Sequence, residues 1–245
     1  MKTLYLDCSM GAAGDMLAAA LLELLPQPLA FLRELNMLGI PGVYYSIETL
    51  TRHGVTGTHL RVTVNGEEEG AHTHTQSART LRDIRSIVYA LPLPTQVKLD
   101  VLAVYAEIAE AESHAHNCPV EYVHFHEVGA MDAVADITAV CLLMSRLAPE
   151  QVLASPIALG SGTVRCAHGI LPVPAPATAY LVRSLPTRSG PVSGELCTPT
   201  GAALLRHFVD QYTESPAPRA AATGRGMGTR DFGVPGALQA MLYET

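Results

Sequence analysis

The stretch LYLDCSMGAAGDM, residues 4–16, decides the fold because it reads as a strand, a glycine-rich turn and the start of a helix. Residues 4–6 form a short apolar run, which indicates a strand buried in a sheet. The turn contains Gly11 and Gly14, and residues 16–25 then hold good helix formers without a breaker. A strand that passes through a tight turn into a helix is typical of proteins that mix both elements.

Helices and strands alternate outward from this stretch. Residues 44–64 are rich in β-branched and aromatic side chains around His53-Gly54, which predicts a hairpin. Residues 120–126 predict another strand. Proline, glycine and runs of helix formers predict helices at about residues 28–38, 80–91, 95–114, 130–147, 177–182 and 201–209. Without repeats or a linker, we expect residues 1–245 to form one compact α/β (mixed α+β) domain, with a mixed sheet and flanking helices.

Composition excludes several classes of protein. The 245 residues are 48% hydrophobic and 16% charged, which is unlike a disordered chain. A formal net charge of -7 argues against nucleic-acid binding. No apolar run reaches the ~18 residues that a membrane span needs, and the first residues do not resemble a signal peptide. Five scattered cysteines fit a reducing compartment, so we expect a cytoplasmic protein.

The densest group of metal-binding residue types lies between residues 112 and 136. His124 and His126 are two apart, so on an extended strand they point the same way, and Glu127 follows at once. Glu112 and His116 are four apart, which places them on one face of a helix. Imidazoles with carboxylates suit Ni²⁺, Zn²⁺ or Co²⁺. Spacing alone leaves open the alternative that these histidines are only hydrogen-bonded.

Weaker candidates surround this group. Asp132 and Asp136 are four apart on the next predicted helix, where the alternative is negative charge that stabilises the helix start. Residues 65–78 form a polar stretch that we expect to be a mobile loop. It carries His72 and His74, a second pair of candidate metal ligands, although a solvated loop is the simpler interpretation.

The glycine turn before the first helix is a candidate anion site. Gly11, Gly14 and Asp15 lie where backbone amides at a helix N-terminus can approach a phosphate. The alternatives are glycines needed only for backbone shape and an Asp15 that caps the helix. The turn at residues 224–231 adds Arg225 and Arg230, which can pair with phosphate or carboxylate groups. No Walker A, G-x-S-x-G or H-E-x-x-H motif occurs, which argues against phosphoryl transfer and serine hydrolysis.

Taken in order, seven short segments resemble the nickel insertion family that completes the nickel-pincer cofactor in lactate racemase maturation. They are spread over nearly the whole chain, which makes the resemblance specific. The segments are LYLDC (4–8), GAAGDM (11–16), VHFHEVGA (123–130), GSGTVRCAHG (160–169), LPVPAPAT (171–178), TPTGAA (198–203) and GTRDF (228–232).

The resemblance implies an enzyme, a nickel chelatase or cyclometallase of the lyase class. It would insert Ni²⁺ into pyridinium-3,5-bisthiocarboxylic acid mononucleotide and cleave CTP to CMP and diphosphate. Family members continue into a C-terminal ferredoxin-like portion that is associated with CTP and Mg²⁺ or Mn²⁺. The 245 residues end before that portion. We therefore expect residues 1–245 to be the N-terminal domain, to need the C-terminal portion as partner, and to be inactive if that portion is missing.

The resemblance also suggests roles for single residues. His124 and His126 would hold Ni²⁺, with Glu127 and either Glu112 or His116 nearby. Arg165 or Arg230 would hold the mononucleotide phosphate. Glu127 or Asp132 would accept the pyridinium C4 proton. A nickel chaperone and a purely structural half remain alternatives, and the sequence leaves open whether the chain forms a homo-oligomer.

Overall fold

The computed structural model describes residues 1–68, 79–125, 128–166, 169–214 and 219–244. Within this part of the chain, one mixed sheet contains eight strands. β1 lies near its centre, antiparallel to β14 and parallel to β5. The order is β12 (Gln211–Tyr212), β5 (Gln151–Ala154), β1 (Lys2–Asp7), β14 (Leu238–Glu244), β13 (Ala222–Gly226), β3 (Val55–Val64) and β2 (Val43–Arg52), with β4 (Glu67–Glu68) paired to β3. The expected mixed α/β fold is confirmed.

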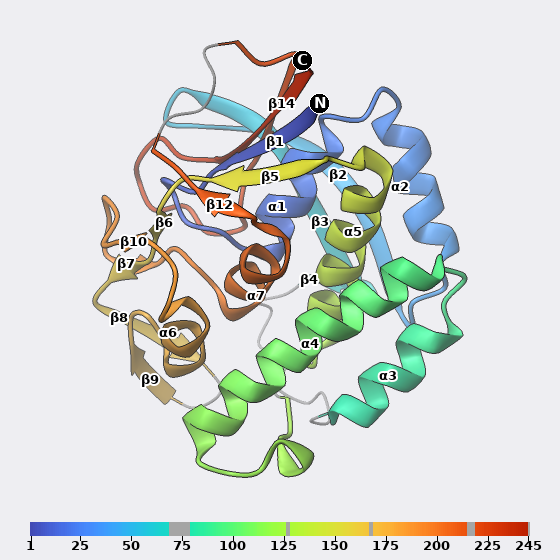
Figure 1. Ribbon diagram of the computed structural model, residues 1–245, viewed down its shortest axis with the longest axis vertical. Helices are drawn as coiled ribbons and strands as arrows, with labels where there is room; N and C mark the ends of the chain where they lie inside the picture. Colours follow the sequence, from blue (N-terminus) through green and yellow to red (C-terminus); the bar gives the residue numbers. More distant parts are fainter. Residues whose placement is uncertain (69–78, 126–127, 167–168, 215–218, 245) are drawn as a thin grey trace.

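The helices cover this sheet in layers (Figure 1). They are α1 (Gly14–Leu22), α2 (Pro28–Met37), α3 (Leu81–Ala90), α4 (Thr95–His116), α5 (Met131–Leu147), α6 (Pro176–Val182) and α7 (Pro199–Phe208). α1 packs on β13 and β3, and α5 packs beside α1. α4 lies across the outside of α5, and α3, α6 and α7 contact it. Because α5 is enclosed from several sides, nearly all its residues are buried.

Three two-stranded ladders lie near α6 and α7 (Figure 1). β10 (Thr187–Arg188) pairs with β6 (Ile157–Ala158), and β11 (Gly194–Glu195) pairs with β7 (Gly160–Ser161). β8 (Thr163–Cys166) pairs with β9 (Gly169–Pro172), and β8 also lies against β11. These ladders position the segment that enters α7 against the glycine turn before α1.

Local chemistry explains the ends of several elements. His53 and Gly54 have φ of 49° and 83°, so two residues with positive φ close the β2–β3 hairpin with the twist that antiparallel strands prefer. Thr80 and Asp83 form a capping box at α3, since each side chain accepts the other residue's backbone amide. Asn117 ends α4 in the left-handed conformation.

The strand expected over residues 120–126 is wrong at its start. Residues Val120–Tyr122 form a 3-10 turn, in which the amide of Tyr122 donates to the carbonyl of Pro119 at 2.9 Å. Pro119 is the residue before the turn and has no amide N–H to pair in a sheet, and this local preference prevails over the β-branched pattern. Within described residues 120–125, only Phe125 pairs as expected, in an isolated bridge with Arg79.

The stretch expected to be a loop, residues 65–78, begins as regular structure. Asn65 and Gly66 form a turn, and β4 then pairs with the end of β3. Residues 69–78 lie outside the described part of the chain. No helix in the described ranges is long and apolar enough to cross a bilayer.

Candidate functional site

The glycine turn before α1 is built by close backbone contact with the segment that enters α7. The amide of Gly11 donates to the carbonyl of Cys8 at 2.9 Å, and that of Ala12 donates to the carbonyl of Leu196 at 3.0 Å. A Cβ at Gly11 would lie 2.0 Å from the Leu196 oxygen. Both amides therefore have backbone partners, and the contact itself explains why residue 11 is glycine. The role of Gly11 in binding a cofactor stays a prediction.

Gly14 brings the start of α1 against α5. A Cβ at this position would lie 2.7 Å from the Cβ of Asp136 and 2.9 Å from its Oδ2. The missing side chain thus lets a carboxylate of α5 lie beside the first turn of α1. Asp132 is one helical turn earlier on α5, so Asp132 and Asp136 share a face as expected.

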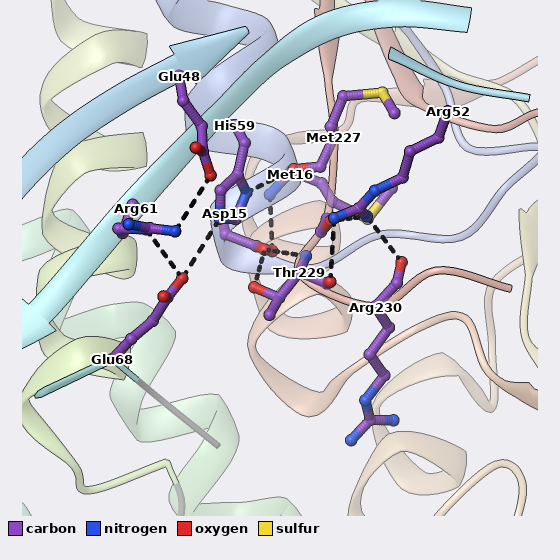
Figure 2. Close-up of polar contacts among 11 residues, drawn as sticks. Asp15, Met16, Glu48, Arg52, His59, Arg61, Glu68, Met227, Thr229 and Arg230 are labelled. Atoms are coloured by element: carbon purple, nitrogen blue, oxygen red, sulfur yellow. Dashed lines mark hydrogen bonds and ion pairs between the residues drawn. The ribbon is translucent and has the colours of Figure 1, made fainter. Parts of the chain in front are cut away.

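Asp15 connects the start of α1 to the segment after β13 (Figure 2). Its Oδ1 accepts the Met16 amide at 2.8 Å, and its Oδ2 accepts the amide and hydroxyl of Thr229 at 3.2 and 3.3 Å. Burial raises the pKa of Asp15, while these hydrogen bonds and the nearby His59 oppose the rise. The N-cap position is Ala13, so Asp15 belongs to the first turn of α1.

The segment after β13 is held from the β2–β3 hairpin (Figure 2). Arg52 donates from Nη1 to the carbonyls of Gly228 and Arg230 at 2.7 and 3.2 Å, and from Nη2 to that of Thr229 at 3.4 Å. The guanidinium of Arg230 points away from Asp15 and lies 3.8 Å from the carboxylate of Glu195. The structure therefore brings Asp15 and the backbone of Arg230 to one place, although the Arg230 side chain has an acidic partner.

Asp132 is a buried carboxylate, 7% exposed, in the first turn of α5. Its Oδ1 is buried and has no hydrogen-bond partner among the described residues. The hydroxyl of the neighbouring Tyr105 donates instead to the carbonyl of Val128 at 3.1 Å. Burial, followed by the charges of Asp132 and Asp136, raises the pKa of Tyr105 well above its ordinary value. A buried side-chain oxygen without a donor is uncommon in folded proteins and can mark a place where a ligand binds.

The predicted metal ligands are only partly described. His124 is exposed between buried Val123 and Phe125, as extended alternation would place it. Arg79 and Phe125 exchange backbone hydrogen bonds of 3.1 and 2.7 Å, so the residues that flank segments 69–78 and 126–127 lie side by side. The other members of these two sets lie outside the described residues: His72, His74, His126 and Glu127.

The remaining predicted residues are separate from Asp15. Glu112 and His116 do share a face of α4, with 3.4 Å between carboxylate and imidazole. Arg165 is exposed on β8. In the described ranges, no three His, Cys, Asp or Glu side chains converge closely enough to hold one metal ion.

Sequence reasoning missed His59 and Glu195. His59 is 3% exposed on β3, where alternation would favour an apolar residue. A polar residue at an inward position of a strand was the available signal. The sequence carries no such signal for Glu195, because its side chain is covered only by segments that are distant in the sequence.

Fold and site together define an α/β protein with carboxylates and a buried imidazole around the first turn of a helix. Residues 4–245 match the family model described as "Nickel insertion protein". The chain belongs to this family.

Three relatives are similar over the whole of this chain, and each is named pyridinium-3,5-bisthiocarboxylic acid mononucleotide nickel insertion protein. The one from Clostridium kluyveri is 39% identical over 62% of its own length. Those from Akkermansia muciniphila and Geobacillus kaustophilus are 38% and 36% identical over 61% and 60% of theirs. The chain thus spans less than two thirds of these relatives. No solved structure matches it.

Proposed function

We propose that this chain takes part in inserting Ni²⁺ into pyridinium-3,5-bisthiocarboxylic acid mononucleotide. The observation that carries the proposal is the likeness of the whole chain to relatives named for this reaction, at 39% and 38% identity. Because the chain covers only part of their length, the proposal includes a division of labour. CTP and its Mg²⁺ or Mn²⁺ ion belong to the C-terminal portion of the family, and nickel and the mononucleotide belong to this chain.

The reaction sets the chemical requirements of the site. Two nickel–sulfur bonds form with the thiocarboxylates, and one nickel–carbon bond forms at pyridinium C4. The C4–H bond breaks, and its proton must go to a base. Asp132 supports this role through its buried Oδ1, which no described donor stabilises. Glu127, outside the described residues, is the alternative base.

Nickel must be bound loosely enough to be released. Imidazole and carboxylate ligands suit Ni²⁺, and the softer thiocarboxylate sulfurs of the substrate can take it from them. We assign this transfer to His124, His126 and Glu127, with either Glu112 or His116 as a further ligand. The exposure of His124 gives incoming metal access.

The substrate phosphate needs a cationic partner. Arg165 is exposed on β8, and Arg230 lies 3.8 Å from Glu195. β8 contacts β11, the strand that carries Glu195, so both arginines belong to the same region of the molecule. If the Arg230 guanidinium left Glu195, it could bind the substrate phosphate beside β11.

The test is a reconstituted insertion reaction. The chain is mixed with Ni²⁺, the mononucleotide, CTP, Mn²⁺ and a separately produced C-terminal portion from a relative, and mass spectrometry follows the nickel-bound product. We expect product with the unchanged chain and none with the His124→Ala/His126→Ala variant. The control is His53→Ala, which changes an exposed histidine in the hairpin turn and should keep activity.

Two results would contradict the proposal. No product from any combination would remove the catalytic role. Nickel binding without mononucleotide binding would identify a nickel chaperone instead. Equal product from the double variant and the His53→Ala control would leave insertion intact but remove His124 and His126 as ligands.

A further inference from the structure

The imidazole of His59 is held in one orientation inside the molecule (Figure 2). It is 3% exposed, and its Nδ1 lies 3.0 Å from the carbonyl oxygen of Met227. A carbonyl can only accept, so Nδ1 must carry the hydrogen. In the neutral ring the lone pair is then on Nε2. Metal-binding histidines are commonly fixed in this way, with one nitrogen donating to a backbone carbonyl and the other facing the ion.

The Nε2 atom faces a carboxylate at a distance too long for a hydrogen bond. Glu68 Oε1 lies 3.7 Å away, whereas N–H···O bonds are about 2.7–3.2 Å. The described residues offer Nε2 no hydrogen-bond partner. Metal–nitrogen and metal–oxygen bonds are each about 2.0–2.2 Å. An ion between the two atoms would therefore fit with little movement, and it would replace the long contact between Nε2 and the Glu68 carboxylate with two metal bonds.

The surrounding charge favours a cation. Glu48 and Glu68 both lie near Arg61, whose guanidinium is 3.4 Å from one carboxylate and 3.2 Å from the other. Asp15 adds a third carboxylate close enough for its charge to interact with that of His59. Three acidic groups against one arginine leave a local excess of negative charge, which a divalent ion would reduce.

We propose that His59 Nε2 and the Glu68 carboxylate form a two-ligand site for a borderline divalent ion, next to the first turn of α1. That the ion is the Ni²⁺ cargo rests on the proposed function. Two protein ligands leave the other positions of the ion to water or to the sulfur atoms of a substrate. Such a site binds weakly and releases its metal readily, which suits a cargo and not a structural ion.

The site is tested with Ni²⁺ alone, by calorimetric titration of the untagged chain. His59→Asn is the informative variant, because its side-chain amide can still donate to the Met227 carbonyl while the Nε2 ligand is removed. His53→Asn is the matched control, since His53 lies in the adjoining turn and pairs with Asp231. We expect His59→Asn to lose one equivalent of bound nickel and His53→Asn to keep it. Equal stoichiometry and affinity in both variants would overturn the proposal.

A second variant covers the case in which His59→Asn does not fold. Glu68→Gln changes a partly exposed residue on β4 and removes only the charged ligand. We expect its nickel affinity to fall at least about tenfold. Affinity within twofold of the unchanged chain would also overturn the site. X-ray absorption of the nickel-loaded chain should show one imidazole fewer in His59→Asn.

These results are independent of the insertion reaction. If His59→Asn loses nickel binding but the unchanged chain forms no product with the mononucleotide, the metal site is supported and the proposed function is rejected. Product formation that is unchanged in both variants, together with unchanged nickel binding, would support the function and reject the site.

Discussion

Thr229 donates two hydrogen bonds to the carboxylate of Asp15, one from its amide and one from its hydroxyl, at 3.2 and 3.3 Å. This contact joins the first helix of the chain to the segment that precedes the last strand. Arg52 holds the same segment from the β2–β3 hairpin. Three distant parts of the sequence thus share one polar centre, and substitutions there should affect both stability and nickel handling.

The first prediction concerns the pH dependence of stability at Asp15. Burial raises its folded pKa above the ordinary value of 3.8, so the folded chain keeps this proton where the unfolded chain has lost it. The contribution of Asp15 to stability is then fully present below the unfolded pKa and is lost as pH rises through the folded pKa. We expect the free energy of unfolding of the unchanged chain, relative to Asp15→Asn, to decrease from about pH 4 upward.

The control for this pH series is Asp231→Asn. The amide of Gly233 and the imidazole of His53 lower the pKa of Asp231, so its contribution is present above the unfolded pKa and is lost as pH falls. Urea unfolding at several pH values should give opposite trends for the two variants. Parallel trends would show that burial of Asp15 does not control its titration.

The second prediction concerns close packing of β13 on α1. A Cβ at Gly226 would lie 1.8 Å from the carbonyl oxygen of Met16, which neither backbone can avoid without moving. Gly226→Ala should lower the free energy of unfolding by about 3 kcal/mol. Gly66→Ala is the comparison, since its φ is +86° but nothing lies within 4 Å of the new atom. It should lose only about 1 kcal/mol. Equal losses in urea unfolding would contradict the packing argument.

The third prediction concerns the start of α7. The hydroxyl of Thr198 accepts the amide of Gly201 at 3.2 Å, as an N-cap residue does. Thr198→Ala should therefore cost about 1 kcal/mol in thermal or urea unfolding, whereas Thr198→Ser keeps the acceptor and should cost much less. If serine and alanine were equally destabilising, the threonine methyl group, and not the cap, would be the important feature.

Features set by neighbouring residues could be predicted from the sequence. The hairpin at residues 44–64 was predicted from His53-Gly54, because both turn residues can adopt positive φ without distant help. The pair Glu112–His116 followed from helical spacing alone. The prediction of a strand at residues 120–126 was wrong at its start, because the residues after Pro119 form a 3-10 turn instead.

Features that depend on distant contacts could not be predicted. Gly11 reads as an anion-binding glycine until Leu196, from another part of the chain, is seen to lie against it. Gly14 likewise gives no sign of Asp136. His59 acquires its fixed orientation from Met227, and nothing near it in sequence indicates that partner. The sequence therefore shows which residues could bind a ligand or metal, but it does not show which of them lie together in the fold.

The last prediction separates stability from function at Asp132. Its buried Oδ1 has no described hydrogen-bond partner, and burying a polar atom without such a partner costs free energy. Asp132→Asn removes the charge and keeps the shape. We expect the free energy of unfolding to rise by about 1 kcal/mol, the gain often seen when a functional group in an unfavourable setting is replaced. If Asp132 accepts the C4 proton, nickel insertion should fall at least about 100-fold.

Asp210→Asn provides the contrast for that experiment. The carboxylate of Asp210 accepts the Val152 amide at 2.8 Å, so this charge has a donor and its removal should lower stability without affecting insertion. Urea unfolding and the reconstituted insertion reaction are measured on both variants. A more stable Asp132→Asn chain with full activity would show that the buried charge serves neither fold nor chemistry. A less stable chain would show that the carboxylate of Asp132 stabilises the fold.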